Sequence, residues 1–467
     1  MKQINTKSVF SRRQIVQSLL GGSLLLPGLL TELLAPNDPQ SAIRNPQSDN
    51  PLAPRSPHFA PRTKRVIFLF STGGVSQVDT FDPKPKLVAM AERKGLGAIN
   101  RPLLRPLWDF KPNARCGTEI SDLFPHLREV MDDVCLIRSM KCDHNEHFQA
   151  TLGMHCGSIT FKRPSMGAWV SYGLGTENQN LPSFIVLAPY LPYAGSQVWD
   201  SDFLPAVHQG TRVIPAAEPV QNLTRRSPSE KIQQRELSLL DELNRQHLRT
   251  RATESTLAAR LKSFETAFGM QREMPEVLDL SKETDATLKL YGLERGSTQG
   301  FAWQCLVARR LAERGVRFIE LIDTGSSNNW DGHSNLKGYE KLARNIDQPI
   351  AGLLRDLKSR GMLDDTLVVW TTEYGRTPWI DQPDGRGHHN FVFSSWLAGG
   401  GAKPGIVYGQ SDEFGDQVAE NEVHVHDFHA TILHLLGFDH TRLTYRHGGR
   451  DYRLTDVHGN VVKGLLA

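Results

Sequence analysis

Short apolar runs alternate with helical patterns along most of the chain. Residues 65–70 form an apolar, β-forming run that stops at a Ser-Thr-Gly-Gly turn, which is typical of a buried parallel strand whose carboxyl end opens on a site. Similar patterns follow, with strands predicted at 134–137, 184–187, 316–321 and 366–370 and helices at 301–314 and 339–360. This alternation predicts an α/β fold, a mostly parallel central sheet with helices on both faces.

One long polar segment interrupts the alternation. Between residues 227 and 268 apolar residues recur near helical spacing within a strongly polar sequence. We expect a helical hairpin there, as part of an insertion at about 227–292 in a main domain that spans 65–467. Such a hairpin would act either as a lid or as a solvated helical insertion.

The N-terminus has the pattern of an export signal. Arg12 and Arg13 precede an apolar, glycine-containing run at 18–35, which is typical of a twin-arginine signal. The alternatives are an ordinary secretory signal and an uncleaved anchor. Residues 36–64 include seven prolines and are expected to form an extended linker. We therefore expect a signal at 1–35, the twin-arginine export machinery as a partner, and a location in the periplasm or at the cell surface.

The charge and the cysteines exclude some classes of protein. The formal net charge of +3 is carried by the first 35 residues, so the remainder is close to neutral, and neither nucleic acid nor an anionic membrane surface is an expected partner. No stable membrane domain is expected beyond the signal. The five cysteines form no CxxC pair and are expected mostly as buried small apolar residues.

Candidate chemistry lies at the ends of the predicted strands. Asp79 follows the glycine pair after the first strand, where the backbone can approach a ligand closely, although Asp and Gly also form ordinary turns. Asp143, His144 and His147 precede a helical pattern at 148–156. They are expected either at a ligand site or as a helix cap with surface histidines.

Two later strand ends carry the most specific pattern, in which acids, an arginine and histidines follow buried strands. They come after the strands predicted at 316–321 and 366–370, and their residues are Asp331, His333, Glu373, Arg376, His388 and His389. Buried carboxylates and imidazoles are costly unless they are paired or bound to metal. The carboxyl ends of parallel strands meet at one edge of a sheet, so we expect several of these side chains to converge there.

These segments together are similar to a known family. The sequences STGGVSQVDTFDPKP, WDGH, TTEYGRTP, GRGHHNF and LAGGGAKPGIVYGQSDEFG closely resemble domain of unknown function 1501, over nearly the whole chain from Arg65 onward. Its members resemble sulfatases and alkaline phosphatases, so the resemblance implies an alkaline phosphatase-like fold with metals held at strand ends. The order Asp331/His333, Glu373, His388 follows the order of ligands in that superfamily.

The resemblance implies a metal-dependent hydrolase of phosphate or sulfate esters, with a small molecule or a glycan ester as substrate. Histidine-rich ligation favours zinc or manganese, with calcium as the alternative. The candidate catalytic residues are Asp143, His144 and Arg376, with Arg376 or Arg386 stabilising the charge that develops on the transferred group. The candidate metal ligands are Asp79, His147, Asp331, His333, Glu373, His388 and His389.

The sequence also departs from the superfamily. The segment that begins at Cys142 lacks the C/S-x-P-S-R motif of sulfatases, and Thr151 lies two turns into the predicted helix rather than at its start. Gly73-Gly74 stands where an acid often follows the first strand, and Tyr374 where a histidine often follows the acid. We therefore expect metal-activated water, not a side chain, to attack the ester. The alternative is a non-catalytic sulfatase-like protein that binds an anionic glycan or a partner protein.

Overall fold

The computed structural model describes residues 50–91, 101–221, 223, 227–249 and 255–467. The predicted signal, 1–35, and the first part of the predicted linker, 36–49, lie outside these residues. No described helix is both long enough and apolar enough to cross a membrane. Residues 50–64, expected to be part of a linker, instead pack on the domain: Leu52 and Thr63 are buried, and the Arg55 amide donates to the Leu174 carbonyl.

A nine-stranded sheet forms the centre of the described chain. From one edge to the other its strands are β12 (Ile406–Tyr408), β4 (Val134–Lys141), β11 (Phe393–Ala398), β8 (Thr366–Thr371), β1 (Arg65–Phe70), β7 (Phe318–Ile322), β5 (Phe184–Leu187) and β6 (Thr211–Val213), while β15 (Val423–His424) pairs with β4. Within this sheet all strand pairs are parallel except those of β11, which runs antiparallel to both β4 and β8. The predicted strands and the mostly parallel sheet are confirmed.

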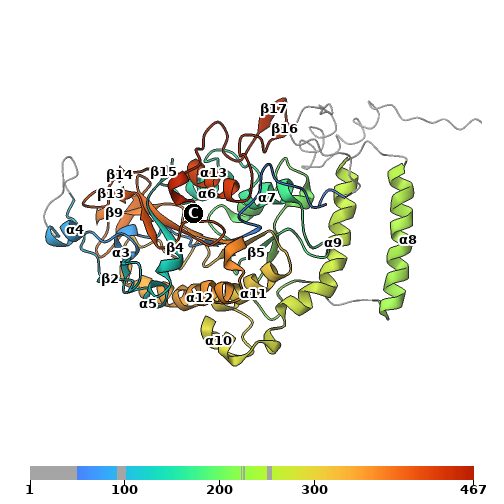
Figure 1. The fold of residues 1–467 in the computed structure, drawn as a ribbon, viewed down its shortest axis with the longest axis horizontal. Helices are drawn as coiled ribbons and strands as arrows, with labels where there is room; N and C mark the ends of the chain where they lie inside the picture. The colour runs from blue at the N-terminus through green and yellow to red at the C-terminus, as the bar shows by residue number, and fades with distance from the viewer. Residues whose placement is uncertain (1–49, 92–100, 222, 224–226, 250–254) are drawn as a thin grey trace, which may run out of the picture.

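Side chains of β1 show why the sheet is covered on both faces. Ile67 and Leu69 belong to one apolar core, whereas Val66, Phe68 and Phe70 belong to another, as the alternation of a strand requires. The helices of the first core are α5 (Pro125–Arg128), α10 (Asp285–Tyr291), α11 (Phe301–Glu313), α12 (Tyr339–Ser359) and the end of α9 (Ser255–Leu278), and those of the second are α6 (His147–Cys156), α7 (Met166–Leu174) and α13 (Val425–Leu435). Figure 1 shows these two helical layers on opposite sides of the sheet.

Short helices and two-stranded pairs lie at the edges of this core. They are the helices α3 (Gln77–Thr80) and α4 (Pro85–Ala89), and the paired strands β2 (Phe110–Pro112) with β3 (Glu119–Ser121), β9 (Gly375–Ile380) with β10 (Arg386–His389), β13 (Gln410–Ser411) with β14 (Val418–Glu420), and β16 (Tyr445–His447) with β17 (Arg450–Tyr452). Of these, the β9–β10 hairpin bears directly on the site.

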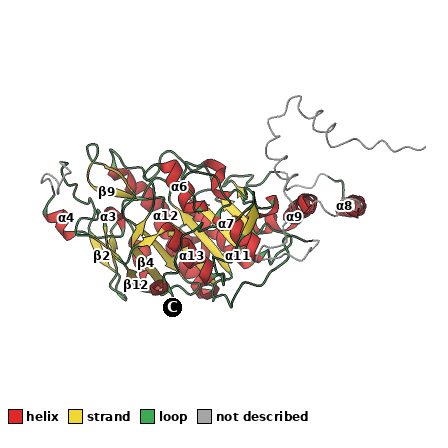
Figure 2. Ribbon diagram, turned by 90° about the horizontal axis from the view of Figure 1, so that it is seen from above, coloured by secondary structure: helices red, strands yellow, loops and turns green. Residues whose placement is uncertain are grey.

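The polar insertion forms the expected helical hairpin, from α8 (Glu230–Arg249) and α9 (Ser255–Leu278). Figures 1 and 2 both place α8 at one end of the molecule, beyond α9 and away from α6. The hairpin is therefore a lateral insertion and does not cover the ends of the central strands. The five cysteines are all unpaired and four are buried, as expected.

Candidate metal centre

Four segments meet where the central parallel strands end. The loop after β7 carries Asp331 and His333, Glu373 comes two residues after β8, and His147 begins α6 a few residues after β4. The β9–β10 hairpin brings His388 opposite Arg376. Because β1, β7, β8 and β4 all run in the same direction, their carboxyl ends share one edge of the sheet. We refer to His147, Asp331, His333 and His388 as the first cluster.

His147 is held between an acid and an aromatic ring. Its Nδ1 lies 2.7 Å from Oε1 of Glu373, and its ring stacks on Tyr193 with the centroids 3.9 Å apart. Its Nε2 lies 3.3 Å from Oδ2 of Asp331, yet this buried nitrogen has no hydrogen-bond partner among the described residues. The unpaired nitrogen thus faces the carboxylate at the centre of the cluster.

His333 and His388 converge on the same carboxylate. Nε2 of His333 lies 3.0 Å from Oδ1 of Asp331, and Nε2 of His388 lies 3.4 Å from it. Their outer nitrogens have oxygen partners: Nδ1 of His333 lies 2.7 Å from Oδ2 of Asp381, and Nδ1 of His388 lies 2.7 Å from the Asn145 carbonyl. The two Nε2 atoms are only 2.8 Å apart.

The partners of the three imidazoles fix where their protons lie. Each Nδ1 faces a carboxylate or carbonyl oxygen, which can only accept, so each Nδ1 carries hydrogen. In the neutral ring the lone pair then lies on Nε2, and all three Nε2 atoms point at Asp331. This pattern of an oxygen acceptor behind each imidazole is typical of histidine ligands to a metal. Within the cluster the ligand atoms of His147, Asp331 and His388 all lie within 4.8 Å of one another.

The electrostatics of the cluster also favour a cation. Burial would lower the pKa of His147, but Asp331 and Glu373 outweigh it and raise that pKa. Burial opposes ionisation of Glu373 as well, yet hydrogen bonds from His147 and the Gly73 amide hold its pKa below the usual value. Two ionised acids therefore face the imidazoles. The residues present fit a divalent metal ion, which would take the place that a proton otherwise takes.

Arg376 forms an ion pair with Asp331. Its guanidinium is fully buried and donates to Oδ1 of Asp331 at 2.6 Å and to the backbone carbonyls of Gly73, Gly74 and Arg386. Burial would raise the pKa of Asp331, but the neighbouring imidazoles of His147 and His388 and the charge of Arg376 hold that pKa well below the usual range. Arg376 therefore acts on the cluster through Asp331.

The glycine pair after β1 allows the site loops to approach. A Cβ atom on Gly73 would lie 2.6 Å from the Asp331 amide nitrogen, and one on Gly74 would lie 2.4 Å from the ring of Tyr374. Both residues have positive φ, at +118° and +71°. Residues with a side chain rarely adopt this backbone conformation. The Gly73 amide donates to both oxygens of Glu373. The glycines that replace the expected acid thus form part of the scaffold of the cluster.

Several predicted residues do not join the cluster. The buried carboxylate of Asp79 pairs with Arg386 at 2.7 Å, and the Arg386 guanidinium is also fully buried. His389 turns to the opposite side of β10 from His388, where its Nε2 donates to the Asp416 carbonyl, because successive strand residues face opposite ways. His144 accepts from the Glu146 amide and makes no described contact with the cluster. Asp143 pairs with His424 at 3.0 Å.

Three residues of the site were not identified from the sequence. Asp381, in the β9–β10 turn, holds His333, and the Asn145 carbonyl holds His388. Tyr193 follows β5 and stacks on His147. Only Tyr193 had a usable signal, since it lies shortly after a predicted parallel strand, where ligand-contacting residues gather.

The site is open to solvent on one side. The side chains of His333 and Asp331 are 31% and 27% exposed, whereas those of His388 and His147 are 16% and 10% exposed. Glu373 and Arg376 beneath them are fully buried. A ligand can therefore reach the first cluster from the side of His333 and Asp331.

A family match and several solved structures provide comparisons. The family described as "Protein of unknown function (DUF1501)" matches residues 63–466. No curated protein matches the chain.

The solved structures that resemble this chain include a synthase, a sulfatase and an alkaline phosphatase, each at low identity. A lipoteichoic acid synthase from Listeria monocytogenes is 11% identical, with 83% of this chain and 76% of that chain covered and a TM-score of 0.35. The PsFucS1 sulfatase from Pseudoalteromonas sp. is 13% identical, with coverages of 85% and 74% and a TM-score of 0.35. An alkaline phosphatase from the Antarctic bacterium TAB5 is 13% identical, with coverages of 73% and 92% and a TM-score of 0.32.

Proposed function

This chain belongs to the DUF1501 family, and we propose that it is an exported, metal-dependent hydrolase of phosphate or sulfate esters. The observation that carries the proposal is the arrangement of three imidazoles, whose Nε2 atoms all lie within 3.4 Å of the Asp331 carboxylate. Each of these rings has an oxygen acceptor at Nδ1, so Nε2 is the atom left to bind a metal.

His147, Asp331 and His388 would hold the ion, with His333 as a further ligand. A nitrogen-rich set favours zinc or manganese over calcium, which prefers oxygen ligands. When bound, such an ion supplies Lewis-acid chemistry, in that it polarises an ester oxygen and lowers the pKa of water. The solvent-exposed side of Asp331 and His333 would admit the substrate, a small-molecule or glycan ester.

The chain's own groups fix the protonation state of this centre. Glu373 and Asp381 keep a proton on Nδ1 of His147 and His333, and the Asn145 carbonyl does the same for His388. Each imidazole is thereby restricted to one tautomer and one orientation. Arg376 keeps Asp331 ionised, and the ring of Tyr193 shields one face of His147.

The side chains that could attack the ester directly are poorly suited to it. Burial raises the pKa of the Cys142 thiol to about 12, so it stays protonated at neutral pH and is a weak nucleophile. Thr151 is fully buried within α6. Both observations support attack by water rather than by a side chain.

The proposal of export rests on the sequence of the first 35 residues, with its Arg12-Arg13 pair. The periplasm or the cell surface is accordingly the proposed location, and the twin-arginine machinery the proposed export partner.

A second candidate function is that of a non-catalytic protein that binds an anionic glycan or a partner protein. The observation in its favour is that Arg376 and Arg386 are both fully buried and engaged with the protein itself. Neither guanidinium is free to contact the charge that develops on a transferred phosphoryl or sulfuryl group.

Ester hydrolysis by the zinc- or manganese-loaded full chain separates these candidates. We expect turnover of an aryl phosphate or an aryl sulfate, its loss in His333→Ala, and its retention in Thr151→Ala. In Asp381→Asn the metal should bind about 10–100-fold more weakly, because a neutral amide oxygen accepts the Nδ1 proton of His333 less strongly than a carboxylate does. Asp384→Asn in the same turn is the matched control, since its φ of +60° suits asparagine.

Two results would reject the hydrolase with attacking water. Loss of activity in Thr151→Ala together with a trapped phosphothreonine would show a side-chain nucleophile. No turnover of either ester with any metal, by protein whose first cluster binds the ion, would favour the binding protein.

A further inference from the structure

A second group of metal-type ligands lies on the other side of the segment that leads from β4 to α6. Asp143 comes two residues after β4, and β15 pairs with the end of β4 so that His424 lies opposite Lys141. His426 follows in the first turn of α13. The ligand atoms of Asp143, His424 and His426, the second cluster, all lie within 4.8 Å of one another.

His424 is oriented by the start of α13. Its Nδ1 accepts the His426 amide at 3.3 Å, so its Nε2 is left to face Oδ1 of Asp143 at 3.0 Å. The hydrogen bond from His424 lowers the pKa of Asp143, and burial does not outweigh it. Asp143 is therefore ionised at neutral pH, and a metal at Nε2 of His424 would displace one proton to solvent.

His426 is the residue that a purely structural role does not explain. It is 7% exposed, and neither of its ring nitrogens has a hydrogen-bond partner among the described residues, Nδ1 being fully buried. Burial, and then the charge of His424, lower its pKa to about 4. A buried imidazole nitrogen without a partner is unfavourable, so an additional partner is expected.

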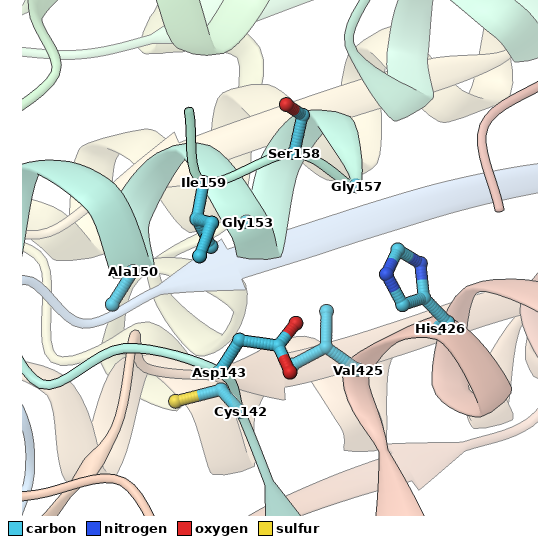
Figure 3. Close-up of a pocket in the computed structure, with 9 residues that line it drawn as sticks. All are labelled: Cys142, Asp143, Ala150, Gly153, Gly157, Ser158, Ile159, Val425 and His426. Carbon is cyan, nitrogen blue, oxygen red and sulfur yellow. The ribbon is translucent and has the colours of Figure 1, made fainter. Parts of the chain in front are cut away.

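The ring of His426 faces a small pocket. Figure 3 shows His426 and the carboxylate of Asp143 on two sides of this pocket, whose far wall comes from α6 and the segment after it. The lining residues are Cys142, Asp143, Ala150, Gly153, Gly157, Ser158, Ile159, Val425 and His426. The second cluster thus has an open side that can take a further ligand.

The capping of α13 accounts for only part of this arrangement. His424 and Asp427 form a reciprocal capping box at the helix N-terminus, which explains why these two residues are there. It uses neither the ring of His426 nor the carboxylate of Asp143. The helix dipole opposes a cation at this end, and the charges of Asp143 and Asp427 offset it.

We propose that Asp143, His424 and His426 form a second binding site for a divalent transition-metal ion of the zinc class, distinct from the first cluster. One carboxylate and two imidazoles are a common three-residue zinc set that leaves one position open. The same segment carries Asp143 in the second cluster and His147 in the first, and Cys142, next to Asp143, donates to the Glu373 carbonyl. The second ion would therefore fix the segment that positions His147.

The test is zinc binding by the full chain in a background that lacks the first cluster, so its outcome is independent of the proposed hydrolase activity. His333→Ala with His388→Ala provides this background. Zinc is counted by elemental analysis after gel filtration, and its affinity is measured against a chromophoric chelator. We expect the background to retain a zinc ion and to melt at a higher temperature with zinc than without it.

Further substitutions in this background locate the ion. His426→Ala or Asp143→Asn should weaken zinc binding by at least about 100-fold, more than the loss of an outer partner does, and should abolish the zinc-dependent rise in melting temperature. His434→Ala is the matched control, since it lies on the same helix and its ring contacts Phe59. The Asp143 side chain is half-exposed and asparagine has the same shape as aspartate. Asp143→Asn therefore tests the site without disturbing the fold. A background that binds no zinc, or zinc binding unchanged in both variants, would overturn the proposal.

Discussion

Asp323 connects two loops of the site through a single side chain. Its oxygens accept hydrogen bonds from the Thr72 amide, from Thr324 and from the Trp330 indole. It therefore ties the end of β1 to the loop that carries Asp331 and His333. Burial raises the pKa of this carboxyl to about 6, although the hydrogen bonds from Trp330 and Thr72 oppose the shift.

This raised pKa predicts a stability change with pH. Between about pH 4 and pH 6 the folded chain keeps a proton on Asp323 that the unfolded chain has released, so the folded state binds more protons. Its stability should then fall as pH rises through this window, by about 3 kcal/mol from this group. Urea unfolding of the metal-free protein across the window measures the slope.

Asp323→Asn should remove that part of the slope. The variant should also be less stable by about 1–3 kcal/mol, because the amide NH₂ would face the Trp330 indole N–H, a second donor. A slope that is the same in both proteins would mean that another group titrates in this range.

At the scale of elements, the two helices of the insertion differ in what they bury. Met270, Met274 and Val277 on α9 belong to the core beneath the sheet, whereas Leu239 and Leu243 on α8 are 64% and 53% exposed. The fold therefore depends on α9 and not on α8. This asymmetry is why α8 extends from the end of the molecule (Figure 1).

A matched pair of substitutions tests this asymmetry. Met274→Ala should lower the free energy of unfolding by about 2–5 kcal/mol, since it leaves a cavity in a packed core. Leu243→Ala should change it by less than about 0.5 kcal/mol, as is usual for surface positions. Denaturant unfolding measures both. Equal effects of the two would show that α8 packs as tightly as α9.

At the scale of the whole molecule, the proposed twin-arginine signal predicts how the chain leaves the cytoplasm. Replacing Arg12 and Arg13 with lysine should leave folded precursor inside the cell, because the export machinery recognises the arginine pair itself. Fractionation of cells that express each full-length chain measures this. Unchanged export of the double variant would indicate an ordinary secretory signal, and membrane retention of both chains an uncleaved anchor.

The elements of the fold could be predicted from the sequence because each one depends on a local pattern. A short apolar run bounded by turn residues specifies a buried strand wherever it occurs, as at β1, β5 and β8. The parallel order of such strands also predicted that the loops around Asp331 and Glu373 would lie near each other. These two predictions needed no knowledge of which strand pairs with which.

The membership of the cluster could be decided only by the tertiary structure. Asp79 and Asp331 both follow strands of the sheet, yet one pairs with Arg386 and the other faces three imidazoles. His388 faces the cluster and His389 faces away, because the strand register of the β9–β10 hairpin assigns their sides. His333 and Asp381 lie far apart in the chain and yet are in contact. Their separation in the sequence does not predict the distance between them in the folded protein. Local sequence patterns determined the elements, whereas strand order and hairpin register determined which charges meet.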